Sequence, residues 1–389
     1  MIFSRFIPTL ALLVGGSLVQ AGEFPELSNL RLNQLQYIST HNSYHIEPEQ
    51  TVDLILLAEK YGDGTEWHSK RLVRSLTYTH FPLEAQLDLG IRSFEIDLYA
   101  DPEGGRYSDP GILNSIRKKG LIPKTAYDPD DQMVEPGFKV LHMQDIDVRS
   151  HCMTFLNCLS IISDWSINNP EHLPIIIQLE AKEGARKPVD KHYTPVEALE
   201  FSPDLWKDVE KEVLTVFPRK KLLTPGDLIG QFSGLKEAVV ENGWPKVKDL
   251  RGKVLFLLIH PGKETNRYLG DDRSLKTKLF FANHGNDSSK YSTFMMFTKP
   301  QKPKHRNQIN RYVKKGFLAY TRADANTEES RRNDTRRKEK AFASGAQIVS
   351  TDYPYPDYRF SNYKVQFPGG VFVRCNPVTA KDECKSSNY

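Results

Sequence analysis

Two carboxylates stand two residues apart inside an apolar stretch of the chain, at Glu95 and Asp97 within residues 94–98. Successive side chains of a β-strand point to opposite faces, so both carboxylates share one face while Ile96 points to the other. Acidic groups held together in apolar surroundings cannot both stay ionised unless a cation or other partners compensate them. The pattern predicts a site where acidic oxygens surround a positive charge.

Further polar residues stand where other apolar runs end. They are His41 and Asn42 after residues 36–39, His142 and Gln144 at residues 140–144, and Glu180 and Lys182 after residues 174–179. A lone strand histidine or a single E-x-D pattern is more often structural or solvated. Here four successive runs deliver such groups at the same end, which indicates one shared site.

These residue types favour phosphate chemistry at a hard cation. Oxygen ligands suit Ca²⁺ or Mg²⁺, and they would come from Asn42, Glu95, Asp97 and Glu180. Both histidines then remain available to exchange protons with the attacking and leaving oxygens of a phosphate ester, while the cation and Lys182 stabilise developing charge. The competing interpretation is a zinc hydrolase that uses His41, His142 and a carboxylate. No H-x-H or H-E-x-x-H spacing supports zinc, so phosphodiester chemistry is preferred.

The rest of the chain alternates between predicted strands and predicted helices. Short apolar, β-rich runs recur at residues 36–39, 91–98, 140–143, 174–179, 254–259, 294–297, 317–321 and 348–351. Helical spacing predicts helices over residues 52–60, 81–89, 152–168, 202–217 and 331–344. This alternation favours an α/β fold, a single distorted TIM (β/α)₈ barrel, whose sites lie at the C-terminal strand ends. Residues 100–137 and 182–203 are expected to be long loops over one barrel face.

The composition indicates a globular and nearly neutral protein. The 389 residues are 39% hydrophobic, and 53 Lys and Arg stand against 49 Asp and Glu. This apolar content argues against a disordered chain, and the absence of a strong basic excess argues against a nucleic-acid partner. The basic segment 299–306 fits contact with anionic lipid, so peripheral membrane contact is expected, with a solvated loop as the equal alternative.

The first residues are typical of a secretory signal peptide. Residues 1–5 carry positive charge, residues 6–14 are apolar, and residues 19–21 form a small-x-small cleavage site. Cleavage after Ala21 would leave residues 22–389 as one secreted domain. The apolar run is shorter than the roughly 20 residues of a membrane span, and an uncleaved anchor is the alternative.

The cysteines and sequons agree with export. Among the possible pairings, the two local loops Cys152–Cys158 and Cys375–Cys384 are the easiest to close. Asn286 and Asn333 each begin a glycosylation sequon. We therefore expect an extracellular, disulfide-bonded glycoprotein.

The motifs around the candidate site resemble those of the calcium-dependent phosphatidylinositol-specific phospholipase C family, and especially its secreted, single-domain bacterial and fungal members. The matching blocks are residues 40–44, 87–97, 243–245 with 250–256, and 345–354. The resemblance implies that His41 stabilises or protonates a phosphoryl oxygen and that His142 is the general acid toward the diacylglycerol oxygen. It also implies a Ca²⁺ site built from Asn42, Glu95, Asp97 and Glu180. One carboxylate would be the base for the inositol 2-hydroxyl, giving an inositol cyclic phosphate.

Other assignments remain open on the same residues. Lys182 and Arg322 are candidates for contacts with the phosphate or head group of a phospholipid or soluble phosphodiester substrate. The carboxylate-x-lysine pattern at Glu180 and Lys182 is similar to that of sphingomyelinase D. The T-D-Y-P sequence at residues 351–354 also occurs in glycerophosphodiester phosphodiesterases. Either enzyme type, or a catalytically silent barrel that binds head groups, is the alternative.

Overall fold

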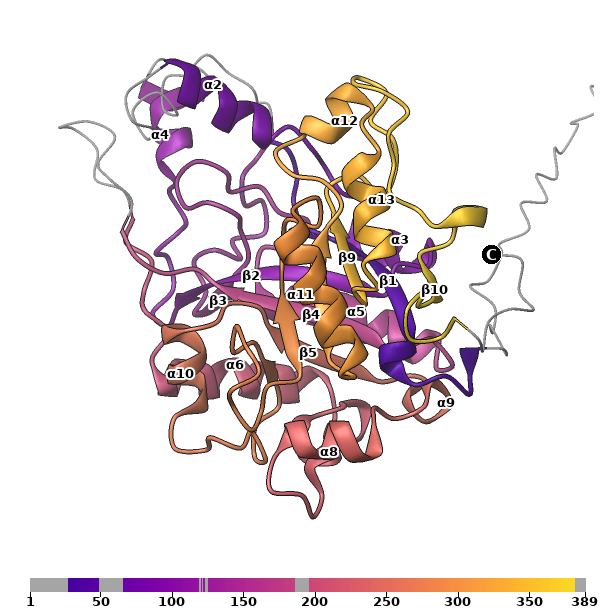
Figure 1. The fold of residues 1–389 in the computed structure, drawn as a ribbon. Coiled ribbons are helices and arrows are strands. Elements are labelled where there is room, and N and C mark those ends of the chain that lie inside the picture. The colour runs from indigo at the N-terminus through magenta and orange to yellow at the C-terminus, as the bar shows by residue number, and fades with distance from the viewer. Residues whose placement is uncertain are drawn as a thin grey trace, which may run out of the picture.

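A computed structural model describes residues 27–48, 66–118, 120, 122, 125–185 and 196–381. Eight parallel strands follow one another around the sheet in the order β6-β5-β4-β2-β1-β9-β8-β7 (Figure 1). They are β1 Leu35–Thr40, β2 Ser93–Asp101, β4 Ile175–Ala181, β5 Val254–Leu258, β6 Phe281–Ala282, β7 Phe294–Met296, β8 Leu318–Arg322 and β9 Ile348–Thr351. A parallel bridge between Asn283 and Phe294 links the two end strands. The sheet is thus a nearly closed barrel, which confirms the predicted α/β TIM-barrel fold.

One predicted barrel strand is wrong. Residues 140–143 are not a strand; the nearby β3, Gly137–Lys139, pairs antiparallel with the far end of β2. β2 is longer than the barrel requires, and β2 and β4 pair directly with each other over Ser93 to Leu98. The projecting end of β2 therefore takes β3 as its partner outside the barrel. The eighth barrel strand is β6, whose two residues are too few for a sequence pattern.

Helices surround the barrel (Figure 1). They are α2 Glu66–Ser75, α3 Leu83–Asp88, α4 Gly111–Lys118, α5 Phe155–Asn168, α6 Pro203–Val216, α7 Pro225–Ile229, α8 Leu235–Asn242, α9 Val247–Leu250, α10 Lys263–Leu269, α11 Pro303–Lys314, α12 Glu328–Arg332 and α13 Arg336–Ala343. Short 3₁₀ turns lie at Leu32–Gln34, Arg219–Lys221 and Pro368–Gly370, and β10, Val373–Cys375, pairs antiparallel with β1. Within the described residues, no helix combines the length and apolar character that crossing a bilayer requires.

Local capping explains where several of these helices begin and end. Thr154 accepts a hydrogen bond from the backbone of Asn157 at the start of α5, and Ser202 caps α6 in the same way. The predicted helix over residues 331–344 is wrong as a single element. Asn333 has φ 50°, a left-handed conformation that ends α12 before α13 begins. The predicted helix over residues 52–60 lies outside the described residues.

The predicted loop over residues 100–137 contains a helix and packs as a small lobe. Side chains of α2 and α4 meet there, with Val73, Ile112 and Ile116 in one apolar cluster (Figure 1). The predicted disulfide between Cys152 and Cys158 is present ahead of and within α5. Cys384 lies outside the described residues, as does the expected signal peptide, so the second disulfide stays a prediction.

Candidate active site

Three acidic side chains gather at the C-terminal side of β2 and β4. Strand register places Asp97 beside Glu180, and Glu95 beside Gln178. Glu95, Asp97 and Glu180 bring oxygens within 4.8 Å of one another. Burial, together with Glu180 and Asp97, raises the pKa of Glu95 to about 8, and burial also raises the pKa of Asp97. The cluster therefore needs positive charge to hold all three groups ionised.

Two cationic or protonatable side chains already face this cluster. Lys182 Nζ contacts Glu180 Oε1 and lies 3.1 Å from Asp97 Oδ2. His260, which follows β5, places Nε2 3.0 Å from the same Glu180 oxygen. Burial by itself would raise the pKa of Glu180, but Lys182 and His260 hold it well below its ordinary value. Lys182 thus lies among the carboxylates, as the shared strand face predicts.

Asn42 supplies an oxygen that lacks a protein partner. Its Nδ2 donates to the hydroxyl of Tyr78 at 2.8 Å, while its buried Oδ1 accepts no hydrogen bond from the described part of the chain. The next residue, Ser43, donates its backbone N–H to the Glu95 carbonyl at 2.9 Å, which ties this turn to β2. A buried carbonyl oxygen without a donor, in a turn bonded to the strand that carries Glu95 and Asp97, fits a ligand of a hard cation.

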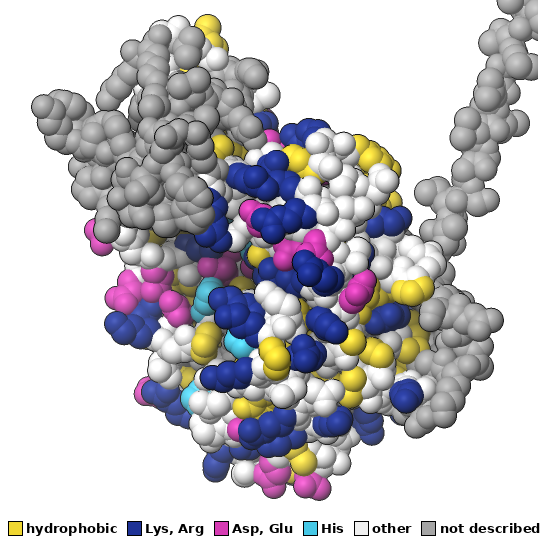
Figure 2. Space-filling view, turned by 45° about the horizontal axis from the view of Figure 1, so that its top comes forward, with side chains coloured by type: hydrophobic (Ala, Val, Ile, Leu, Met, Phe, Trp, Pro, Cys, Tyr) yellow, Lys and Arg dark blue, Asp and Glu magenta, His cyan; other side chains and the backbone are white. Residues whose placement is uncertain are grey.

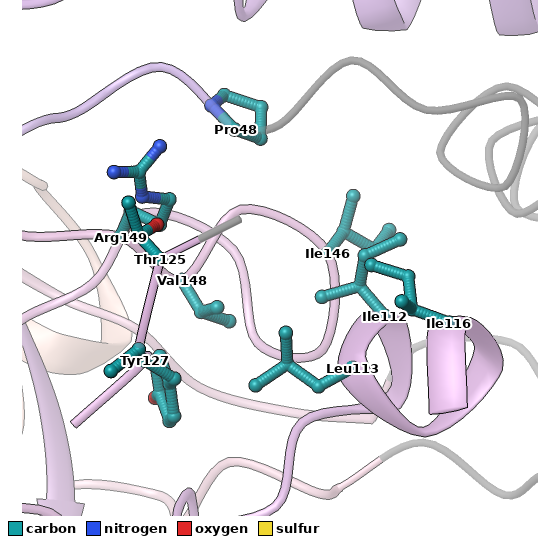
Figure 3. A pocket seen from close by; sticks show the side chains of 10 residues that line it. Pro48, Ile112, Leu113, Ile116, Thr125, Tyr127, Ile146, Val148 and Arg149 are labelled. Atoms are coloured by element: carbon teal, nitrogen blue, oxygen red, sulfur yellow. The ribbon is translucent and has the colours of Figure 1, made fainter. Parts of the chain in front are cut away.

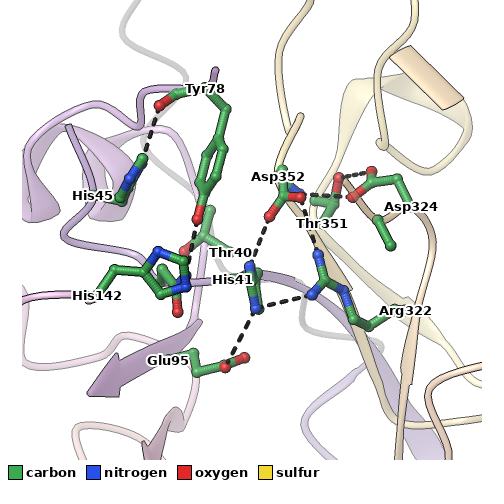
Figure 4. Close-up of polar contacts among 12 residues, drawn as sticks. Thr40, His41, His45, Tyr78, Glu95, His142, Arg322, Asp324, Thr351 and Asp352 are labelled. Carbon is green, nitrogen blue, oxygen red and sulfur yellow. Dashed lines mark hydrogen bonds and ion pairs between the residues drawn. The ribbon is translucent and has the colours of Figure 1, made fainter. Parts of the chain in front are cut away.

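His41 directly follows β1 and is held by two strand-end residues (Figure 4). Its Nδ1 lies 2.7 Å from Asp352 Oδ1, and Arg322 lies 2.9 Å from its Nε2. A guanidinium can only donate, so Nε2 must accept and Nδ1 must carry the proton toward Asp352. Burial and then Arg322 lower the pKa of His41 to about 4. The ring is therefore neutral at neutral pH, with its lone pair on Nε2.

Asp352 is itself anchored from behind. Arg322 donates to its Oδ2 at 3.0 Å, and its backbone N–H donates to Asp324 Oδ1 at 2.9 Å. Thr351, at the end of β9, also donates to Asp324. These contacts fix the Asp352 carboxylate and thereby the orientation of the His41 ring (Figure 4).

The second histidine is oriented by a residue on its own loop. His142 Nδ1 lies 2.7 Å from Asp147 Oδ2, and His45 Nε2 lies 2.8 Å from the same oxygen. A turn closed by the Met143 N–H and the Asp147 carbonyl, 2.9 Å apart, brings Asp147 back to His142. Burial would raise the pKa of Asp147, but the two imidazoles lower it to about 2. Asp147 is thus an anion that holds His142 through Nδ1 and leaves Nε2 to the site.

The structure brings together the residues that the sequence predicts for the site. Figure 4 shows His41, Glu95, His142 and Arg322 facing one space, although His142 lies on a loop rather than at a barrel strand end. In Figure 2, histidine and acidic side chains are seen among Lys and Arg side chains on the face toward the viewer.

Four further residues of the site were not predicted from the sequence. Asp352 and His260 follow barrel strands, so the strand-end rule could have found them. Asp147 and His45 meet only through the folded loops, and no spacing in the sequence indicates that contact.

An apolar pocket lies next to the His142 loop (Figure 3). Aliphatic side chains of α4, including Leu113, line one side, and Ile146 and Val148 line another. Ile146 and Val148 belong to the same loop as His142 and Asp147. One loop therefore contributes residues both to the pocket and to the site, and the barrel and its two oriented histidines define a phosphodiesterase-type site.

The chain is similar to one protein family and to several solved structures. The family model described as phosphoinositide phospholipase C, Ca²⁺-dependent, matches residues 30–377. A calcium-dependent phosphoinositol-specific phospholipase C from a Gram-negative bacterium, Pseudomonas sp., is similar with a TM-score of 0.51 and 17% identity, covering 92% of this chain and 99% of that chain. A Ca²⁺-dependent phosphatidylinositol-specific phospholipase C from Streptomyces antibioticus gives a TM-score of 0.48 and 16% identity, covering 83% and 94%. No curated protein matches the chain.

The family match extends over most of the chain, from ahead of β1 to beyond β10. The chain belongs to the family of Ca²⁺-dependent phosphoinositide phospholipases C. It is accordingly an enzyme of the phosphoric diester hydrolase class, and a catalytically silent barrel is not the preferred interpretation.

Proposed function

We propose that this enzyme cleaves the glycerol–phosphate bond of phosphatidylinositol-type lipids with the help of Ca²⁺. The inositol 2-hydroxyl would attack the phosphorus, the bond to the glycerol oxygen would break, and inositol cyclic phosphate and diacylglycerol would form. The observation that carries the proposal is the pair of differently oriented histidines, His41 and His142, facing one acidic cluster. Attack by a tethered hydroxyl needs no second molecule to be positioned, which favours this route entropically.

The proton transfers are assigned from the hydrogen bonds of the two rings. His41 Nε2 carries no proton and accepts from Arg322, so it would take the proton of the attacking hydroxyl when that hydroxyl replaces the guanidinium at Nε2. This assignment differs from the expectation that a carboxylate is the base, because the proposed cation would engage the carboxylates Glu95, Asp97 and Glu180. His142 presents Nε2 opposite Asp147 and donates a proton to the departing glycerol oxygen.

Asn42, Glu95, Asp97 and Glu180 would hold the calcium ion. The buried Asn42 Oδ1 without a donor and the three carboxylates make an all-oxygen donor set that suits Ca²⁺. A bound divalent cation would supply charge stabilisation for the phosphate oxygens and lower the pKa of a nearby hydroxyl. Arg322, whose guanidinium faces His41, would add a fixed positive charge beside the phosphate.

Lipid rather than a soluble diester is the favoured substrate class. The apolar pocket beside the His142 loop supports this choice, because diacylglycerol leaves on the side of the general acid. Peripheral contact with the membrane would bring that pocket to the lipid. An exported enzyme, processed after Ala21 into one domain of residues 22–389, fits such a substrate, and the sequon residues Asn286 and Asn333 are exposed as glycosylation requires.

Phosphorus NMR of the products tests the proposal. Phosphatidylinositol incubated with the enzyme and Ca²⁺ is expected to give inositol cyclic phosphate, and a chelator is expected to abolish the reaction. Glycerophosphoinositol and sphingomyelin serve as competing substrates in parallel samples. Cleavage of glycerophosphodiesters alone would favour a glycerophosphodiesterase, and release of choline from sphingomyelin would favour a sphingomyelinase D-like enzyme.

A further inference from the structure

Lys182 places an ammonium group inside the acidic cluster. Its Nζ contacts Glu180 Oε1 and lies 3.1 Å from Asp97 Oδ2. Its backbone N–H donates to the Leu98 carbonyl at 2.9 Å, which fixes the main chain beside β2. The side chain is 20% exposed, whereas that of Asp97 is fully buried. A positive charge with a route toward solvent therefore stands among the oxygens that the proposed function assigns to calcium.

We propose that Lys182 competes with the divalent cation for Asp97 and Glu180, and that this competition couples cation binding to the binding of an anionic phosphate. The inference rests on the proposed function for the place of the cation. Ca²⁺ lies about 2.3–2.6 Å from its oxygen ligands. An ammonium in contact with the same oxygens would stand a few ångströms from it, and like charges at that range repel strongly in a buried site. The cation and the ammonium exclude each other.

The contacts around Lys182 permit this exchange. A lysine carries its charge at the end of a flexible four-carbon stem, so it can swing away while its backbone stays in place. Glu180 keeps a second partner when the ammonium leaves, because His260 Nε2 lies 3.0 Å from its Oε1. The Lys182 ammonium would then leave the carboxylates of Asp97 and Glu180 and contact the negatively charged phosphate of the substrate at the mouth of the site. Lys182 thereby occupies the acidic cluster in the metal-free enzyme and contacts the substrate in the metal-bound enzyme.

Thermodynamic linkage gives the proposal a distinct signature. If the cation expels the ammonium and a phosphate retains it outside the cluster, each ligand favours binding of the other by the same factor. A lysine that binds phosphate without ever occupying the cluster would not oppose cation binding. The affinity for Ca²⁺, rather than activity alone, therefore reports the competition.

Isothermal titration of Ca²⁺ into the full chain measures this effect. Lys182→Met removes the charge and keeps much of the length of the side chain, and Lys182→Arg keeps the charge as a matched control. We expect Lys182→Met to bind Ca²⁺ at least tenfold more tightly than the parent, and Lys182→Arg to bind it about as the parent does. Added myo-inositol 1-phosphate should tighten Ca²⁺ binding severalfold more in the parent than in Lys182→Met, where only direct contact between the cation and the phosphate remains.

A second measurement guards against a folding defect in Lys182→Met, since this variant leaves Asp97 and Glu180 without their cation. The rise in melting temperature caused by Ca²⁺ should be larger in Lys182→Met than in the parent. Equal or weaker Ca²⁺ binding by Lys182→Met would overturn the competition while leaving the proposed function intact. Absence of Ca²⁺ binding by both proteins would overturn the competition together with the calcium requirement, and phosphatidylinositol cleavage in chelator would then show whether the phospholipase activity survives.

Discussion

Replacing Asp147 by asparagine should disable the general acid while leaving the barrel in place. The carboxylate accepts from His142 Nδ1 at 2.7 Å and from His45 Nε2 at 2.8 Å, and it is fully buried. Both nitrogens of His45 face acceptors, since Nδ1 lies 3.0 Å from the Tyr78 carbonyl. Asp147 therefore supports both imidazoles, His45 as well as His142.

The size of the effect follows from the loss of charge-assisted bonding. A hydrogen bond to a charged group contributes about 1.5–3 kcal/mol, roughly twice a neutral one. Asp147→Asn weakens the hydrogen bond to His142 Nδ1, which stabilises the protonated ring before the proton is transferred. The substitution also allows the neutral ring to adopt the wrong tautomer. A loss of about 3 kcal/mol in transition-state stabilisation corresponds to a fall in kcat of roughly 100-fold.

The assay compares two leaving groups. Phosphatidylinositol loses a poor alkoxide leaving group and needs the acid, whereas a nitrophenyl ester of inositol phosphate loses a good leaving group and needs it far less. Asp147→Asn should therefore lose about 100-fold on the lipid and only a few-fold on the nitrophenyl ester. Asp145→Asn is the matched control, because Asp145 accepts from the backbone of Gly111 and Val196. An equal loss on both substrates, or the same pattern in the control, would refute the role of Asp147.

Three further predictions concern stability and substrate. Burial raises the pKa of Glu212 to about 7 from 4.5, so its contribution to stability is present below pH 4.5 and is lost as pH rises through 7. Glu212→Gln should raise the melting temperature by about 2 °C at pH 8 and leave it unchanged at pH 4, where an equal rise would contradict the reasoning. Replacing Cys152 and Cys158 by alanine should lower the free energy of unfolding in urea by about 2 kcal/mol, and an unchanged value would argue against a stabilising loop closure. Leu113→Ser, in the apolar pocket, should lower kcat/KM roughly tenfold for long-chain phosphatidylinositol but not for glycerophosphoinositol; equal losses would deny the pocket a role in lipid binding.

The barrel could be predicted from the sequence wherever a strand is buried on both faces. The segment Ile175–Ala181 is almost continuously apolar, and it forms β4 as expected. Residues 140–143 have the same appearance but lie in a loop, because β3 takes the projecting end of β2 as its partner. An apolar run predicts that a segment is buried, but it does not predict which other segment packs against it. Phe281–Ala282 forms a barrel strand with two residues, which no periodicity can reveal.

The site divides in the same way between local and long-range information. The alternation of Glu95 and Asp97 within one strand was sufficient to predict their common face, and register then adds Glu180. The protonation of His41 was not predictable, since it depends on Arg322 and Asp352 from β8 and the end of β9. Contacts across hundreds of residues set the proton position on His41, whereas His142 is oriented by Asp147, five residues away on a folded loop.

The proposed reaction requires that the substrate's own 2-hydroxyl attacks the phosphorus. The most direct test is a phosphatidylinositol analogue in which that hydroxyl is replaced by hydrogen, incubated with enzyme and Ca²⁺ and followed by release of diacylglycerol. The analogue should bind as a competitive inhibitor and should not be cleaved detectably. Release of diacylglycerol at a rate close to that of the natural lipid would contradict it and would point to direct attack by water.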